Sequence, residues 1–242
     1  METTKEYFDR VAVPFNNNYV ERDAFRERRR LWERLVRENL PRAAAESLCM
    51  DMGCGDGTLG QVAAASGART IGIDQSEGML TLARARARER GLSGQMNYVS
   101  APLPLPPSFV DEYQGRADLI LCSSVIEYIE SYEEVLRQFQ QLLRAGGRLI
   151  VSVPNGYSLY RWGEKALGQL HLQRDSYLRH QRHSFFPDDF KALMGDLGYL
   201  ALHEEYFALP LHPLTSKLVG QRRGRRLSML YLLVAEKPAA PL

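Results

Sequence analysis

The sequence predicts an α/β protein in which a seven-stranded, mostly parallel sheet carries helices on both faces and ends in an antiparallel strand. Two observations support this prediction. Short apolar segments alternate with amphipathic helical segments at the spacing of strand–helix–strand units. A glycine-rich turn at 53–57 joins the first apolar segment to the helix after it. The expected architecture is therefore a sheet between two layers of helices.

Each expected element has a local reason. Trp32 and Leu35 recur at helical spacing in the first helix, which Pro41 ends, and Ser76 is a suitable N-cap for a later one. The segment at 117–125 is apolar over most of its length, as strands covered on both faces are. Helices are expected at 23–41, 57–66, 76–91, 131–147 and 186–199. Strands are expected at 47–52, 69–74, 95–101, 117–125, 148–154, 200–208 and 227–238.

The tail of the chain departs from the alternation. No helical pattern fits between the last two expected strands, so 209–226 is expected to be a long excursion between antiparallel neighbours at the sheet edge. We expect one domain over 1–242. Its parts are an N-terminal lid and helix (1–40), a core (45–155) and two cap insertions (156–185 and 208–227).

Composition limits the function classes. The 242 residues are 45% hydrophobic and 25% charged with a net charge of +2, so the overall charge does not indicate a nucleic-acid partner. The three cysteines lack zinc-ligand spacing, which favours reduced thiols, and no metal site is expected. The N-terminus is polar, and no apolar run reaches the ~20 residues that span a bilayer. We therefore expect a soluble, cytoplasmic protein.

The glycine turn indicates a bound ligand. Unpaired amides at a helix start favour anionic groups, and missing side chains let a ligand approach the backbone. Asp74 ends the next expected strand, near the offset at which a carboxylate accepts from ribose hydroxyls, so an adenosine-containing cofactor is expected. The spacing is G-x-G-x-G with Asp56 inside it. An acid there, with Asp51 upstream, suits a sulfonium and an amino group better than a pyrophosphate. Asp56 is equally well interpreted as a solvated turn residue.

The sequence then resembles the class I S-adenosylmethionine-dependent methyltransferases. "LCMDMGCGDG" resembles their motif I and "IGIDQSEGML" their motif II, while 117–155 resembles their fourth strand, helix and fifth strand. "HSFFPDDFKALMGDLGY" resembles a later segment that often carries a histidine. The pattern is most similar to ubiquinone-pathway O-methyltransferases. The resemblance implies a Rossmann-like fold, with S-adenosylmethionine as cofactor and S-adenosylhomocysteine as product.

The resemblance also implies a set of cofactor-binding residues. Asp51 would orient the methionine amino group, Asp74 would bind the ribose hydroxyls, and Ser123 would face the reacting methyl group. The third strand ends without the acid that often meets the adenine. Core packing is the alternative explanation of Cys122, Met79 and Ala101, and for Cys122 it is favoured over any role in the chemistry. The full set is Asp51, Gly53, Cys54, Gly55, Asp74, Gln75, Met79, Ala101, Cys122 and Ser123.

The sequence also offers candidates for the catalytic and lid residues. Relatives carry Glu-His after the fourth strand, where this chain has Glu127 and Tyr128, so His183 becomes the candidate general base, with a surface histidine as the alternative. Tyr19 is a candidate lid residue, beside Tyr7 and Phe8. The aromatic residues of the cap, Tyr157, Tyr160 and Trp162, suit an aromatic or apolar substrate or a cap that packs on itself. The arginines at 26–30 are expected on a solvated helix face.

The expected function is transfer of a methyl group to a small molecule, with oxygen as the favoured acceptor. A methyltransferase acting on tRNA or protein is one alternative, although nucleic acid is disfavoured. A protein that binds S-adenosylmethionine without catalysis is the other, because the glycine turn and its acids serve binding alone. The oligomeric state is left open.

Overall fold

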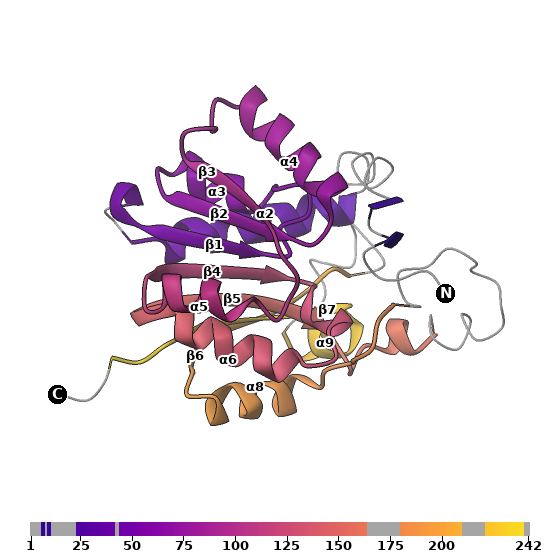
Figure 1. Cartoon of the computed structure of the whole chain (residues 1–242). Coiled ribbons are helices and arrows are strands. Elements are labelled where there is room, and N and C mark those ends of the chain that lie inside the picture. Colours follow the sequence, from indigo (N-terminus) through magenta and orange to yellow (C-terminus); the bar gives the residue numbers. More distant parts are fainter. Residues whose placement is uncertain are drawn as a thin grey trace.

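Seven strands form one sheet in the computed structural model, in the order β3-β2-β1-β4-β5-β7-β6 (Figure 1). The structure describes residues 6–7, 9–10, 23–41, 44–163, 180–209 and 221–239. The strands are β1 (Leu48–Met52), β2 (Arg69–Asp74), β3 (Met96–Ser100), β4 (Ala117–Ser123), β5 (Leu143–Pro154), β6 (Leu200–Phe207) and β7 (Leu230–Glu236). The first five pair in parallel, whereas β7 is antiparallel to β5 and to β6. The predicted fold class is confirmed.

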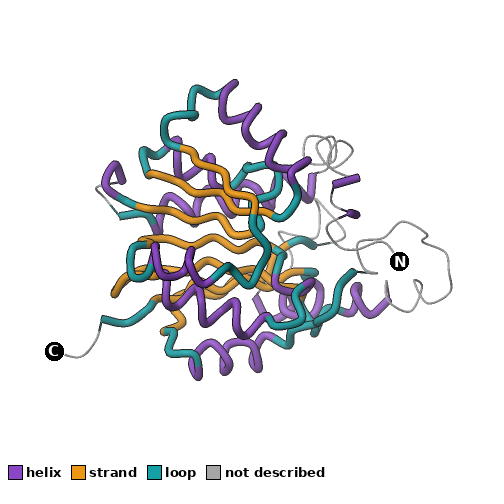
Figure 2. The backbone as a smooth tube through the Cα atoms, viewed as in Figure 1, coloured by secondary structure: helices purple, strands orange, loops and turns teal. Residues whose placement is uncertain are grey.

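The helices follow the strands in the predicted alternation (Figure 2). They are α2 (Asp23–Asn39), α3 (Gly60–Ala65), α4 (Glu77–Glu89), α5 (Pro107–Tyr113), α6 (Tyr132–Leu142), α8 (Pro187–Asp196) and α9 (Gln221–Leu227), with 3-10 turns η1 (Ala44–Glu46) and η2 (Ile126–Tyr128). As predicted, the Ser76 hydroxyl caps α4 by accepting from the amide of Met79 at 3.1 Å.

The helices cover both faces of the sheet because the strand residues alternate. Leu119 and Leu121 of β4 pack with Trp32 and Leu35 of α2. Ile120, between them in sequence, packs on the opposite face with residues of α6 and α8. Helix α2 also packs on α3. Helix α2 therefore belongs to one covering layer, and α6 and α8 belong to the other.

One expected helix boundary was wrong, and two helices were not expected. Helix α6 ends at Leu142 rather than near residue 147, because Leu143 already pairs with Ala117 of β4 and the Gly146 amide donates to the Lys237 carbonyl. The sequence reasoning missed α5, a helix of 7 residues that begins with a proline at its first position. It also missed α9, which packs on β6 within the expected excursion.

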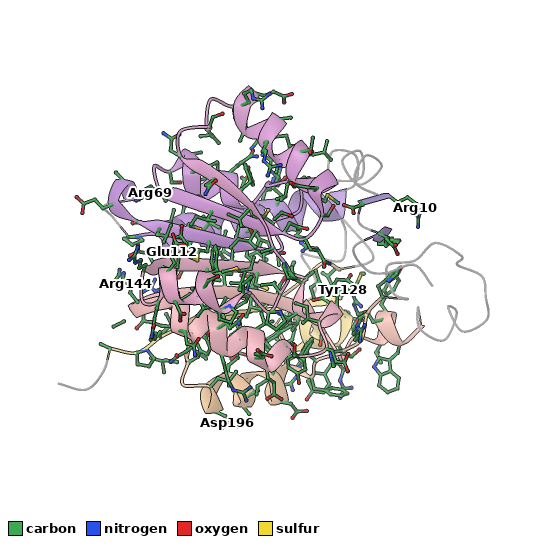
Figure 3. The ribbon with its side chains drawn as sticks, viewed as in Figure 1. Arg10, Arg69, Glu112, Tyr128, Arg144 and Asp196 are labelled. Atoms are coloured by element: carbon green, nitrogen blue, oxygen red, sulfur yellow. The ribbon has the colours of Figure 1, made fainter. Side chains whose placement is uncertain are left out.

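The strand order identifies the edge of the sheet at which a ligand is expected to bind. β1 pairs with β2 on one side and with β4 on the other, so the chain reverses its direction of winding between them. Ligands of open α/β sheets bind at the carboxyl ends of the strands beside such a switch point. Figure 3 shows Arg10 and Tyr128 toward this edge, and Arg69 and Arg144 at the opposite one.

Candidate active site at the carboxyl edge of the sheet

The glycine turn after β1 folds back over the end of β2. The amides of Gly53 and Cys54 both donate to the Ile73 carbonyl, at 2.8 and 3.0 Å. Gly53, Gly55 and Gly57 all have positive φ, at +67°, +51° and +77°. A Cβ at Gly53 would lie 2.4 Å from Val125, and one at Gly57 would lie 2.7 Å from the Tyr98 hydroxyl. A Cβ at Gly55 would meet nothing within 4 Å, so the turn opens to a ligand at Gly55.

Asp74 fastens this turn from the end of β2. Its Oδ2 accepts from the Gly55 amide at 2.8 Å, and its Oδ1 accepts from the Ser76 amide at 2.9 Å. The side chain is half-buried, and burial raises the pKa of its carboxyl. Asp9 of the N-terminal segment accepts from the Ser76 hydroxyl beside it. The turn, Asp74 and the start of α4 therefore form one hydrogen-bonded unit.

Asp51 lies beneath the turn, with 1% of its surface exposed. Its Oδ2 accepts from the Gly60 amide at the start of α3, at 2.8 Å. The pKa of this carboxyl is raised to about 7, chiefly by burial; the hydrogen bond from Gly60 opposes the rise, and repulsion by Asp74 and Asp56 contributes to it. A cationic group entering above Asp51 would favour its ionised form.

Asp56 fits neither of its two interpretations. Only 5% of it is exposed, so it is not a solvated turn residue. One carboxylate oxygen accepts from the amide and hydroxyl of Thr58, and the other accepts from Arg86 of α4 at 2.5 Å. The positive partner of Asp56 is therefore a side chain of this protein, and the residue joins the turn to α4.

The end of β4 carries the second group of polar side chains. Arg28 of α2 donates to the Ser123 hydroxyl at 2.5 Å and to the Ser124 hydroxyl at 3.2 Å. Arg28 is half-buried, so the expected solvated face was wrong for this arginine. Ser124 has a φ of +56°, a conformation rare outside glycine. Helix α2 is thus tied to the strand end that faces the switch point.

Glu127 follows in η2, with 2% of its surface exposed. Burial raises the pKa of its carboxyl to about 7, and the charges of Arg161 and Arg28 act in the opposite direction. Its main-chain carbonyl accepts from the amides of Arg182 and His183, at 2.8 and 3.1 Å. This contact attaches the segment before α8 to the end of β4.

A family model described as "Methyltransferase domain" matches residues 24–204. The chain belongs to this methyltransferase family. A ubiquinone biosynthesis O-methyltransferase of Pseudomonas aeruginosa is 29% identical over 106 residues. The aligned part covers 44% of this chain and 44% of that protein, so the chain matches less than half the length of that relative.

Solved structures share the fold of this methyltransferase-family chain. The magnesium protoporphyrin IX methyltransferase of Synechocystis, solved with bound S-adenosylhomocysteine, is 19% identical with a TM-score of 0.70, over 96% of this chain and 97% of that one. The [4+2]-cyclase SpnF is 18% identical with a TM-score of 0.66, over 98% and 97% of the two chains. A protein named for a different reaction therefore shares this fold, and the fold alone does not establish the chemistry.

The other predicted cofactor residues of this methyltransferase-family chain line the turn or the core. Cys54, Met79, Ala101 and Cys122 are buried, and Gln75 is half-buried. Burial raises the pKa of both thiols well above the usual value, so both stay protonated at neutral pH. Packing explains Met79, Ala101 and Cys122 without a ligand.

Of the predicted catalytic and lid residues, the structure describes His183 and Tyr7. The imidazole of His183 packs against the Tyr132 ring, with centroids 4.7 Å apart. Its Nε2 is buried and has no hydrogen-bond partner. The ring of Tyr7 packs against the imidazole of His180, with centroids 4.8 Å apart, so Tyr7 lies beside the segment that precedes α8. Tyr19 and Phe8 lie outside the described residues.

The cap aromatics mostly face solvent or each other. Trp162 is 65% exposed, and its indole donates to the Gly156 carbonyl at 2.9 Å. The Tyr157 ring contacts the tilted ring of Phe186, with centroids 5.2 Å apart, and the guanidinium of Arg225 lies over it, 4.5 Å from its centroid. In the described part of the cap, self-packing accounts for Tyr157.

Sequence reasoning missed two arginines of the site. Arg161 lies in the helical turn at 159–163 and is 7% exposed. Its partners are the Met229 carbonyl at 3.0 Å and the Gln181 side chain at 3.1 Å. Arg28 could have been found, because it stands four and seven residues before Trp32 and Leu35 and so shares their buried face. No comparable periodic signal exists for Arg161.

Proposed function

We propose that this protein binds S-adenosylmethionine and transfers its methyl group to a hydroxyl oxygen of a small molecule. The Gly55–Asp74 unit carries the proposal. It holds the Asp74 carboxylate at the end of β2, next to the switch point of the sheet. Beside this carboxylate lies Gly55, where an added side chain would occupy the space that is open to a ligand. The chain's own amides and acids suit a ligand that combines ribose hydroxyls with an ammonium group.

Two acids, Asp74 and Asp51, would bind different parts of the cofactor. Asp74 would accept from the ribose hydroxyls, and Asp51 would orient the amino group above the start of α3. When bound, the cofactor supplies an electrophilic methyl group on a positively charged sulfur that leaves readily. The protein's contribution is to position the acceptor in line and to exclude water.

The choice of oxygen rests on two supports. The P. aeruginosa relative is named as an O-methyltransferase. A hydroxyl acceptor must lose a proton, and unpartnered atoms of Glu127 and His183 lie on adjoining segments of this edge. His183, the general base proposed from the sequence, and Glu127 are thus the two candidate bases, and Tyr19 remains a proposed lid residue. The cytoplasmic location and the aromatic or apolar character of the acceptor also remain predictions.

Calorimetry with S-adenosylhomocysteine tests the cofactor site. We expect wild type to bind it and Asp74→Asn to bind at least ten-fold more weakly. Asp196→Asn is the matched control, because Asp196 is exposed on α8, away from the edge (Figure 3). Equal binding by both variants, or none by wild type, would refute the proposed site.

Turnover separates an enzyme from a binding protein. Wild type incubated with S-adenosylmethionine and a metabolite pool of its host should release S-adenosylhomocysteine and form a methyl ether. A protein that only binds the cofactor would release none. Methyl groups recovered in tRNA or protein instead would favour the alternative substrates.

A further inference from the structure

One buried carboxylate oxygen has no partner. Among the described side chains, five have a buried polar atom without a hydrogen bond: Trp32, Gln61, Glu127, His183 and Ser228. The Oε2 of Glu127 is the single carboxylate oxygen in this set. A buried unpaired carboxylate is among the most costly polar groups in a protein, so its retention needs an explanation.

Two arginines influence the charge of Glu127, and no hydrogen bond from either of them to its carboxylate is found among the described residues. Arg161 and Arg28 both act electrostatically on its carboxyl. Their hydrogen bonds go elsewhere, Arg28 to the two serines that end β4 and Arg161 to the Met229 carbonyl and Gln181. No ion pair of Glu127 within 4.0 Å is found among the described residues. The carboxylate is therefore supported by positive charge while one oxygen stays available.

The backbone fixes Glu127 beside the proposed transfer site. The residue lies four positions after Ser123, in the 3-10 turn that packs on β5. The amides of Arg182 and His183 hold its carbonyl from the other side. By contrast, the imidazole of His183 packs against the rings of Tyr132 and Phe185, with centroids 4.7 and 6.2 Å away, and these aromatic neighbours disfavour approach of a polar acceptor.

We propose that Glu127, rather than His183, binds the acceptor hydroxyl and takes its proton during methyl transfer. The proposal rests on the proposed function. In the step, the hydroxyl proton moves to Oε2 of Glu127, and an oxygen lone pair forms the new C–O bond. The C–S bond breaks, and its electron pair stays on sulfur as a neutral thioether. The negative charge of the carboxylate and the positive charge of the sulfonium disappear together.

The protonation of Glu127 suits this role. Its pKa of about 7 leaves a large ionised fraction at neutral pH together with useful basicity. The groups that face it are Arg28 from α2, Arg161 from the turn after β5 and the Cys122 thiol from β4. The arginines oppose the effect of burial, so ionisation remains accessible in the working pH range.

The test compares two glutamates of the same segment. Glu127→Gln removes the buried carboxylate, and Glu130→Gln removes an exposed one that pairs with Arg182 at the surface. A third variant, His183→Asn, tests the competing base. Calorimetry first measures S-adenosylhomocysteine binding for all four proteins, and this measurement reports on the proposed function alone. Phenol, catechol and benzyl alcohol are then titrated into each saturated complex at pH 6 and pH 8.

The expected result is specific to Glu127. At least one probe should bind wild type more tightly at pH 8 than at pH 6, and Glu127→Gln should weaken that binding at least ten-fold and remove its pH dependence. Methylation of that probe from S-adenosylmethionine should fall at least a hundred-fold. Glu130→Gln should match wild type within two-fold, and His183→Asn should keep the pH dependence of probe binding that Glu127→Gln loses. Unchanged probe binding in Glu127→Gln, failure of all three probes to bind wild type, or loss only in His183→Asn would overturn the proposal.

Discussion

Replacing Asp51 with asparagine is expected to stabilise the protein at alkaline pH while it abolishes cofactor binding. The amide keeps an oxygen that can accept from Gly60, so the start of α3 is preserved. It cannot ionise, so the variant avoids the cost of a buried charge. A gain of stability with a loss of binding is the pattern expected for an acid kept for function.

The magnitude follows from the pKa. The carboxyl of Asp51 titrates near 3.8 when unfolded and near 7 when folded. Between these values the unfolded state loses its proton first, so rising pH favours unfolding until Asp51 ionises in the folded state too. From pH 5 to pH 7 each pH unit costs about 1.36 kcal/mol, so wild type loses about 2.7 kcal/mol relative to Asp51→Asn between pH 5 and pH 8.

Urea unfolding of the ligand-free proteins at pH 5, 6.5 and 8 measures this difference. Asp196→Asn serves as the control for loss of an exposed acid. Binding of S-adenosylhomocysteine to wild type should also tighten from pH 6 to pH 8, because its ammonium group meets an ionised Asp51. A stability difference between Asp51→Asn and wild type that stays constant from pH 5 to pH 8 would refute the reasoning.

Three further substitutions test the same site. Gly55→Ala should lower the free energy of unfolding by about 1 kcal/mol, because Gly55 has a positive φ, and should weaken S-adenosylhomocysteine binding at least ten-fold. Gly91→Ala is the control, because Gly91 has a φ of +69° and lies far from the turn. It should lower the free energy of urea unfolding by the same amount and leave binding intact. Asp56→Asn should lose about 2 kcal/mol of unfolding free energy with little change in calorimetric affinity, and the reverse pattern would return Asp56 to the cofactor. Arg28→Met should cost about 2 kcal/mol in urea unfolding, because two charged hydrogen bonds are lost, and Arg29→Met, which breaks an exposed pair, should cost under about 0.5 kcal/mol.

No helix in the described part of the chain is long and apolar enough to cross a membrane.

The sequence by itself determined the sheet, its helices and the turn that indicates the cofactor. These features depend on local patterns, since apolar periodicity selects strand or helix and positive φ selects glycine. Gly53, Gly55 and Gly57 were predicted as a ligand-binding turn, and all three have positive φ. The position of Asp74 beside the turn could be predicted, because one strand–helix–strand unit brings the end of the second strand next to the end of the first.

Only the tertiary structure decided the partners of the charged residues. Asp56 meets Arg86 at a separation of 30 residues, and Arg28 meets Ser123 at a separation of 95. No periodic pattern encodes such pairs, because they arise when whole elements pack together. The raised pKa values of Asp51 and Glu127 have the same origin, since burial is a property of the packed layers rather than of the residues nearby in sequence.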